Sequence, residues 1–115
     1  EPRWSHLRTL IHMPNPELKQ KILQTIACIP TGKLCTYGKV AEIAGLPRYA
    51  RLVGSTLKNL PSGSKIPWHR VVNSQGRISF PEGSDAHRKQ VQRLEAEGVI
   101  LTGGKYNLRH YLWIP

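Results

Sequence analysis

Acidic residues are scarce in this chain: only seven Asp and Glu stand against seventeen Lys and Arg, which leaves a formal net charge of +10 on 115 residues. So strong a positive field on a small protein predicts a polyanionic partner, with nucleic acid first and an anionic membrane surface second. No apolar run approaches the roughly 18–20 residues of a membrane-spanning helix, and no basic amphipathic helix dominates the sequence. Membrane binding is therefore the weaker interpretation.

Cysteine is nearly absent as well. Cys28 and Cys35 form no CxxC pair, so their spacing predicts no zinc site, and we expect neither a metal nor another cofactor. Two thiols favour a reduced, intracellular protein over a disulfide scaffold, which means the cytoplasm or nucleoid of a bacterium or the nucleus of a eukaryote. Residues 1–13 carry no apolar core of a secretory signal, and we interpret them as a leader before one domain over residues 14–115.

The composition, with 39% hydrophobic residues, is that of a globular domain, and its periodicity is mainly helical. Apolar residues at helical spacing predict helices over residues 16–29, 37–44, 48–60 and 85–97. The second and third are short and are joined by a turn containing Gly45, which indicates a helix-turn-helix, although many helical hairpins that never touch DNA look alike. Ser84 is expected to cap the fourth helix, and Gly98 to end it.

The remaining segments predict turns and short extended pieces. Residues 74–77 have the composition of a tight turn, after which Ile78 and Ser79 are expected to begin a short extended return. The tail over residues 99–115 predicts a small hairpin around Gly103-Gly104, followed by a cluster of Leu, Tyr and Trp. The chain therefore reads as one mostly α-helical domain with short strands.

Three separated motifs are more specific: residues 36–45, residues 50–54, and the stretch Ile66-Pro67-Trp68-His69-Arg70-Val71-Val72. In sequence, order and spacing they closely resemble the DNA-binding and active-site domain of the O6-alkylguanine-DNA alkyltransferases, over about residues 17–113. That family carries Pro-Cys-His-Arg where this chain has Pro67 to Arg70, and a Trp there is the mark of the alkyltransferase-like proteins. The resemblance implies a single small winged helix-turn-helix-like domain.

Trp68 in place of the reactive cysteine changes the expected chemistry. Direct dealkylation needs a thiolate that attacks the alkyl carbon, whereas an indole offers only an N–H donor. A flat ring nevertheless packs well beside a flipped base, so we interpret Trp68 as lining a reading pocket, with an ordinary core tryptophan as the alternative. In the enzymes a His beside the Cys joins a relay that ends in a Glu near the C-terminus. Here His69 remains, and His110 is expected where that Glu would fall.

The resemblance also implies how the chain would hold DNA. The helix over residues 48–60 would enter the minor groove, with Ala50 and Gly54 small enough for close approach. Arg51 matches an arginine finger that fills the space left by the flipped nucleotide, and its alternative is a solvated helix arginine. Tyr37 matches a tyrosine that pushes on the target's phosphate, and its alternative is an aromatic packed on the core.

Further residues are carried over from the same resemblance. Asn59 would brace the recognition helix against the active-site loop, Arg70 would tie strand and loop together, and residues 76–84 would form a lid. Some relatives place an arginine late in this lid, where this chain has Phe80-Pro81-Glu82. The lesion pocket is predicted from Tyr37, Pro67, Trp68, His69, Val71 and Ser79, and DNA contacts from Thr36, Tyr37, Ala50, Arg51, Gly54, Asn73 and Ser74.

The sequence thus predicts a monomeric, non-enzymatic sensor of O6-alkylguanine in duplex DNA. By resemblance, its complex with the lesion would attract nucleotide excision repair proteins. Two other functions stay open: an active alkyltransferase that uses another residue, and a general helix-turn-helix regulator that reads sequence through the major groove.

Overall fold

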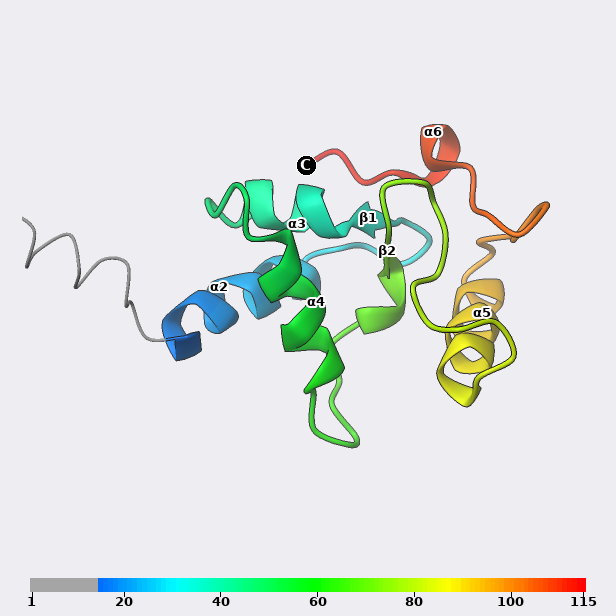
Figure 1. Cartoon of the computed structure of the whole chain (residues 1–115). Coiled ribbons are helices and arrows are strands. Elements are labelled where there is room, and N and C mark those ends of the chain that lie inside the picture. The colour runs from blue at the N-terminus through cyan, green and yellow to red at the C-terminus, as the bar shows by residue number, and fades with distance from the viewer. Residues whose placement is uncertain (1–14) are drawn as a thin grey trace, which may run out of the picture.

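The structure is a computed structural model that describes residues 15–115, so the predicted leader over residues 1–13 lies outside the described residues. In chain order it contains α2 (Asn15–Ala27), β1 (Cys35–Thr36), α3 (Tyr37–Ile43), α4 (Ala50–Lys58), the 3-10 helix η1 (Trp68–Arg70), β2 (Val71–Val72), α5 (Asp85–Ala96) and α6 (Leu108–Tyr111) (Figure 1). The mostly helical fold with short strands is as predicted.

Helices α2, α3 and α4 pack on one another around the first of two cores. The apolar stripe of α2 supplies Ile22 and Ile26, which are fully buried, and Ile29 follows in the turn after the helix. Val40 of α3 and Val53 of α4 complete the contact from the other side. The predicted first helix is confirmed, although it ends at Ala27 and not at residue 29, since residues 28 and 29 already form a turn.

The start of α4 differs from the prediction for a backbone reason. Arg48 has a φ of +78°, in the left-handed region that an α-helix cannot include, so the helix begins at Ala50 and not at residue 48. At its other end Asn59 is the C-cap, so Leu60 lies beyond the helix. Helix α3 begins where expected, because the Thr36 hydroxyl accepts a hydrogen bond from the Lys39 amide at 3.1 Å.

Strands β1 and β2 form a two-stranded parallel sheet in which Cys35 pairs with Val71 and Thr36 with Val72. The sheet brings the start of α3 beside the end of η1, two regions that lie far apart in the sequence. The tail adds to it, since the Leu34 amide donates to the Tyr111 carbonyl at 2.8 Å and the Trp113 amide donates to the Leu34 carbonyl at 2.8 Å.

The turn after β2 contains one glycine that the fold requires. Gly76 has a φ of +77°, and a Cβ there would lie 2.5 Å from the Tyr106 carbonyl oxygen. The predicted turn is therefore confirmed, but the extended return at Ile78 and Ser79 is wrong: neither residue belongs to a strand. The reason is that β2 takes its partner from β1, while the turn packs against the chain near Tyr106.

The second core surrounds the buried face of α5, where Leu94 packs with Val72, Val99 and Tyr106. The Ser84 hydroxyl accepts from the His87 amide at 3.2 Å, which confirms the predicted N-cap. The hairpin at Gly103-Gly104 is also confirmed by the antiparallel bridge between Thr102 and Lys105.

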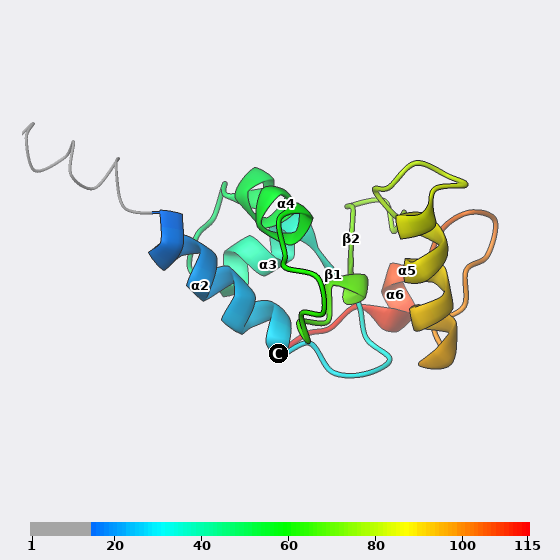
Figure 2. The same ribbon diagram turned by 90° about the horizontal axis from the view of Figure 1, so that it is seen from below.

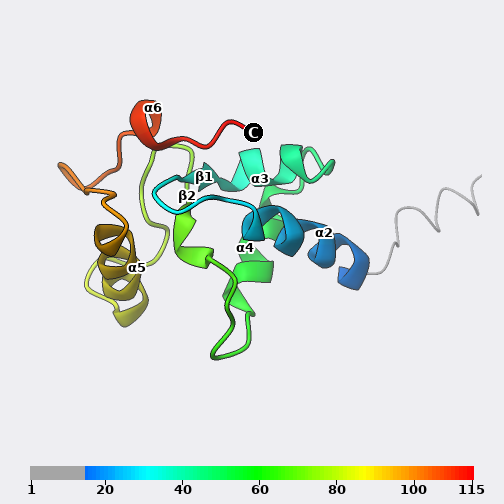
Figure 3. The same cartoon turned by 180° about the vertical axis from the view of Figure 1, so that it is seen from behind.

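Seen from below and from behind, α5 stands apart from α2, α3 and α4, with the short strands between them (Figures 2 and 3). Within residues 15–115 no helix has the length and hydropathy to cross a membrane, and no cluster of three or more potential metal ligands occurs.

Candidate nucleic-acid interface

Trp68 is half-buried, and its indole is contacted on several sides by residues of other elements. The ring of Phe80 meets it edge-on, with 6.0 Å between centroids and an interplanar angle of 85°. The neighbouring His69 ring lies at 6.1 Å and 88°, and Cζ of Arg93 lies 5.3 Å from the indole centroid. These edge-to-face and cation–π contacts fix the orientation of the indole.

Trp68 lines a pocket of about 460 Å³ between α4 and α5, together with Phe80 and Arg93. Its walls come from the end of α4, the loop after it, η1, the loop before α5 and α5 itself. The lining residues are Tyr37, Leu57, Lys58, Leu60, Pro61, Ser62, Gly63, Ser64, Trp68, Val71, Phe80, Asp85, Ala86, Lys89, Gln90 and Arg93. Trp68 is therefore a pocket residue and not an ordinary core tryptophan.

The predicted pocket residues are only partly brought together. Tyr37, Trp68 and Val71 line the cavity, whereas Pro67 and Ser79 do not. His69 lies behind Trp68 and is buried.

The wall that sequence reasoning missed is α5, which contributes residues 85, 86, 89, 90 and 93. This spacing places them on one helix face, so the periodicity itself was the available signal.

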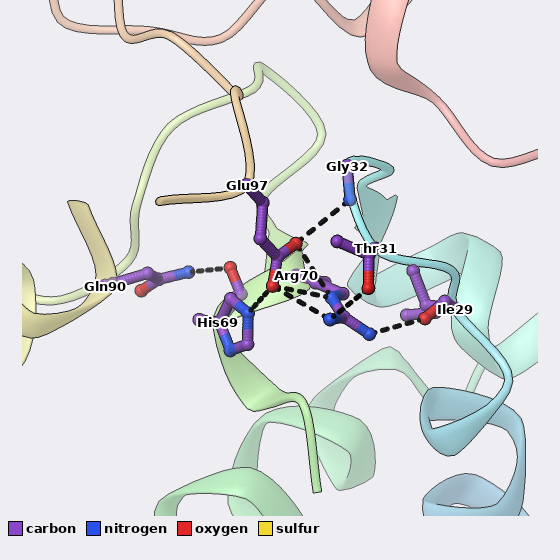
Figure 4. Close-up of polar contacts among 7 residues, drawn as sticks. All are labelled: Ile29, Thr31, Gly32, His69, Arg70, Gln90 and Glu97. Atoms are coloured by element: carbon purple, nitrogen blue, oxygen red, sulfur yellow. Dashed lines mark hydrogen bonds and ion pairs between the residues drawn. The ribbon is translucent and has the colours of Figure 1, made fainter. Parts of the chain in front are cut away.

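Behind Trp68 the carboxylate of Glu97, just after α5, gathers three segments of the chain (Figure 4). Its Oε2 lies 2.6 Å from His69 Nε2, its two oxygens accept from Arg70 at 2.8 to 3.2 Å, and its Oε1 accepts from the Gly32 amide at 3.0 Å. Arg70 continues the network, donating to the Ile29 carbonyl at 2.8 Å and to the Thr31 hydroxyl at 3.1 Å. It thereby holds η1 to the turn after α2 and to the end of α5.

The protonation states follow from these contacts. Burial disfavours the charge on Glu97, but the bonds from Arg70, Gly32 and His69 outweigh it and lower the pKa of the carboxyl to about 2. Burial also lowers the pKa of His69 and outweighs its bond to Glu97, so the imidazole is neutral at pH 7. Because the carboxylate can only accept, His69 Nε2 carries the proton. Nδ1 is then an acceptor that finds no partner among the described residues.

The expectation that His110 stands in place of the relay glutamate is wrong. Glu97 is the partner of His69, while the ring of His110 packs on Tyr111 with centroids 4.7 Å apart. The prediction placed the relay acid in the tail. The acid lies at the C-cap of α5, where the Gly98 turn leaves its side chain directed at η1.

Gln90 is a second buried polar anchor that the sequence did not single out. Its side-chain Nε2 donates to the carbonyls of His69 at 3.1 Å and Val71 at 2.9 Å. These carbonyls belong to η1 and β2. Gln90 therefore ties the backbone segment that contains Trp68 to helix α5. A buried glutamine satisfied in this way specifies the position of the segment.

The predicted DNA-contacting residues lie around α3 and α4. Arg51 is exposed in the first turn of α4, and Ala50 is half-buried. Gly54 lies against Tyr37, because a Cβ on Gly54 would be 4.0 Å from the Tyr37 ring. Tyr37 packs on the first core and also lines the pocket, so the core-packing interpretation is confirmed, and a contact with the target's phosphate stays a prediction.

Three other residues predicted for the site, two as DNA contacts and Asn59 as a brace, form local hydrogen bonds within the protein. Thr36 uses its hydroxyl to cap α3. Asn59 donates to the Ser55 carbonyl at 2.8 Å within α4, so the expected brace from Asn59 to the active-site loop is replaced by a bond within its own helix. Asn73 accepts from the Gln75 and Arg77 amides, each at 2.9 Å, and shapes the turn after β2.

Ser74 is exposed on that turn and lines a different hollow, formed with Gln75, Thr102 and residues 105–109. Neither Asn73 nor Ser74 lines the pocket beside Trp68.

Comparison with known proteins shows what the domain that contains this pocket is similar to. Residues 17–99 match the family model described as 6-O-methylguanine DNA methyltransferase, DNA binding domain. A DNA base-flipping protein of Vibrio parahaemolyticus is 54% identical over 96 residues, which cover 83% of this chain and 94% of that protein. Alkyltransferase-like protein 1 of Schizosaccharomyces pombe is 42% identical over 104 residues, with 86% and 96% covered.

A solved structure extends the comparison to DNA. The crystal structure of the S. pombe Atl1 protein in complex with damaged DNA containing O6-carboxymethylguanine superimposes with a TM-score of 0.81 at 41% identity. The match covers 87% of this chain and 97% of that one.

Proposed function

Because this chain belongs to the family of the 6-O-methylguanine DNA methyltransferase DNA-binding domain, among its alkyltransferase-like members, we propose that it is a non-enzymatic sensor of O6-alkylguanine. In this proposal the protein flips the alkylated nucleotide out of duplex DNA and holds the base in the pocket beside Trp68. The names of its relatives support base flipping, and the S. pombe complex supports binding to a lesion.

The observation that carries the proposal is the position of Trp68 on the pocket wall, within the motif where the alkyltransferases have their cysteine. A transfer reaction would need a thiolate at this wall. Neither cysteine lines the pocket, and burial raises the pKa of Cys35 to about 11, so that thiol stays protonated at neutral pH. No cysteine thiolate is therefore available at the pocket wall, which supports binding of the base over transfer of its alkyl group.

Flipping would use two residues, one at the start of α4 and one in the pocket wall. The exposed Arg51 of α4 can enter the base stack from the minor groove, where its positive, planar head replaces the displaced base. Tyr37 lies where the pocket meets α4 and can press on the target's phosphate. An alkylated guanine pairs weakly, so its extrusion costs less than that of an intact base, and this difference supplies selectivity.

Since the alkyl group stays in place, the product of binding is the complex itself. We propose that a single copy of the chain marks the lesion and that nucleotide excision repair proteins act on the marked site. The support for this step is the family resemblance alone. The +10 charge supports tight, salt-dependent association with the duplex that the step requires.

The test is the variant Trp68→Leu, compared with wild type on an O6-methylguanine duplex and an unmodified duplex of the same sequence. We expect the variant to lose its preference for the lesion while it keeps most of its affinity for the unmodified duplex, because phosphate contacts are untouched. Unchanged preference would contradict the assignment of Trp68. A sequence-reading regulator would instead bind one operator tightly with or without Trp68, and a methylated protein in the mass spectrum would reveal an enzyme.

A further inference from the structure

The pocket wall formed by α5 is basic. Lys89 and Arg93 stand one helical turn apart on it, and Lys58 at the end of α4 lies across the cavity. The acidic residue of the lining, Asp85, is already paired with Arg88 in the first turn of α5. The pocket therefore keeps a surplus of positive charge.

These three cations have no anionic partner of their own. In the part of the chain that the structure describes, none of them makes an ion pair or a side-chain hydrogen bond. Like charges four residues apart on a helix repel each other, so Lys89 and Arg93 favour an anion close to both. An anion that enters the pocket would find unpaired donors on its wall.

Arg93 differs from the two lysines because its position is defined. Its guanidinium lies over the indole of Trp68, with Cζ 5.3 Å from the ring centroid, and the cation–π contact holds it there. A guanidinium so placed presents a planar fork of N–H donors, which matches the two oxygens of a carboxylate. Arg93 and Trp68 both line the pocket, so a flipped base whose O6 edge faces α5 would bring its O6 substituent to this fork.

From these contacts we propose that Arg93 is a specificity-determining residue, which makes the pocket favour O6 adducts that carry an anionic group over uncharged adducts of equal size. The inference rests on the proposed function, since it concerns which lesion the same pocket prefers. Lys89 adds charge to the same wall, and Arg93 supplies the directed bonds.

A competing account is that Arg93 contacts a backbone phosphate. The two accounts predict different patterns. A phosphate contact carries no information about the adduct, so its loss weakens binding to every duplex by the same factor. A contact to the adduct weakens binding only to the duplex whose adduct is charged.

The experiment compares three duplexes of one sequence at one salt concentration, containing O6-carboxymethylguanine, O6-carbamoylmethylguanine or unmodified guanine. The first two adducts are nearly identical in size and differ in charge. We expect wild type to bind the carboxymethyl duplex roughly tenfold more tightly than the carbamoylmethyl duplex, as for a charge-assisted hydrogen bond. Arg93→Gln should bring this ratio close to one, Arg93→Lys should keep part of it, and Lys21→Gln, which removes a charge from α2, should leave it unchanged.

Two results would overturn the inference while leaving the proposed function intact. One is a wild-type ratio near one with both adducts still preferred over guanine. The other is an equal loss on all three duplexes in Arg93→Gln, which would assign the residue to a phosphate. A wild-type protein that prefers neither adduct over guanine would overturn the proposed function as well, so the two failures are distinguishable.

Discussion

Replacing Glu97 with glutamine should remove a large part of the stability of the fold, although the two side chains have nearly the same size. The carboxylate holds His69, Arg70 and the Gly32 amide, and the Glu97 side chain is only 12% exposed. The pKa of about 2, against an ordinary 4.5, corresponds to about 3 kcal/mol in favour of the folded state. Glutamine would in addition leave the partly buried Arg70 without a counter-charge.

The effect has a defined pH dependence. Glu97 has a lowered pKa in the folded state, so its contribution is complete above about pH 4.5 and is lost as the pH falls towards 2. His69 acts in the same direction, because its lowered pKa means that acid favours the unfolded chain. The contribution of Glu97 to the gap in unfolding free energy between wild type and Glu97→Gln should therefore be complete from pH 7 down to about pH 4.5 and should fall below that pH.

Thermal unfolding followed by circular dichroism measures this directly. A loss of about 3 kcal/mol lowers the Tm of a domain of this size by roughly 10–20 °C. Glu95→Gln is the matched control, since Glu95 is exposed in the last turn of α5 and its side chain makes no hydrogen bond or ion pair within the described residues. Equal Tm values for the two variants, or a gap that stays constant from pH 7 to pH 3, would refute the reasoning.

Three further results are expected. Arg51→Ala should weaken lesion binding at least tenfold, whereas Lys19→Ala on α2 should weaken it only as much as the loss of one surface charge does. Equal effects of the two substitutions would mean that Arg51 is not the arginine finger. A thiol reagent at pH 8 should label Cys28 and spare the buried Cys35 until denaturant is added, and two labels on the folded protein would contradict the burial. Gly76→Ala should lower unfolding free energy by at least 2 kcal/mol in urea titrations, and an unchanged midpoint would contradict the clash with the Tyr106 carbonyl.

The sequence predicted those features that depend on neighbours along the chain. The apolar stripe of α2, the Ser84 cap and the Gly98 stop each follow from local rules, and the structure has all three. The start of α4 was predicted two residues too early, because the left-handed backbone of Arg48 leaves no mark in its residue type. Its side chain is compatible with a helix, and only the packing of the preceding turn decides against one.

The candidate site, like the fold, could be predicted only where its residues are neighbours along the chain. The motif around Trp68 was visible because its residues are consecutive. The pocket wall on α5 belongs to a separate element, and the bond from His69 to Glu97 joins residues 28 positions apart. The bond to Glu97 could be found only once the fold had brought the end of α5 beside η1. Residues 85, 89 and 93 did carry a helical period, but nothing local stated which surface that face would meet.

The central claim is that the protein binds the lesion and leaves it unrepaired. The most direct measurement is a competition assay between an O6-methylguanine duplex and its unmodified twin, after which the bound DNA is recovered and its methyl group quantified. The account predicts a clear preference for the lesion duplex, with the methyl group fully retained. Loss of the methyl group, or equal affinity for the two duplexes across several salt concentrations, would contradict it.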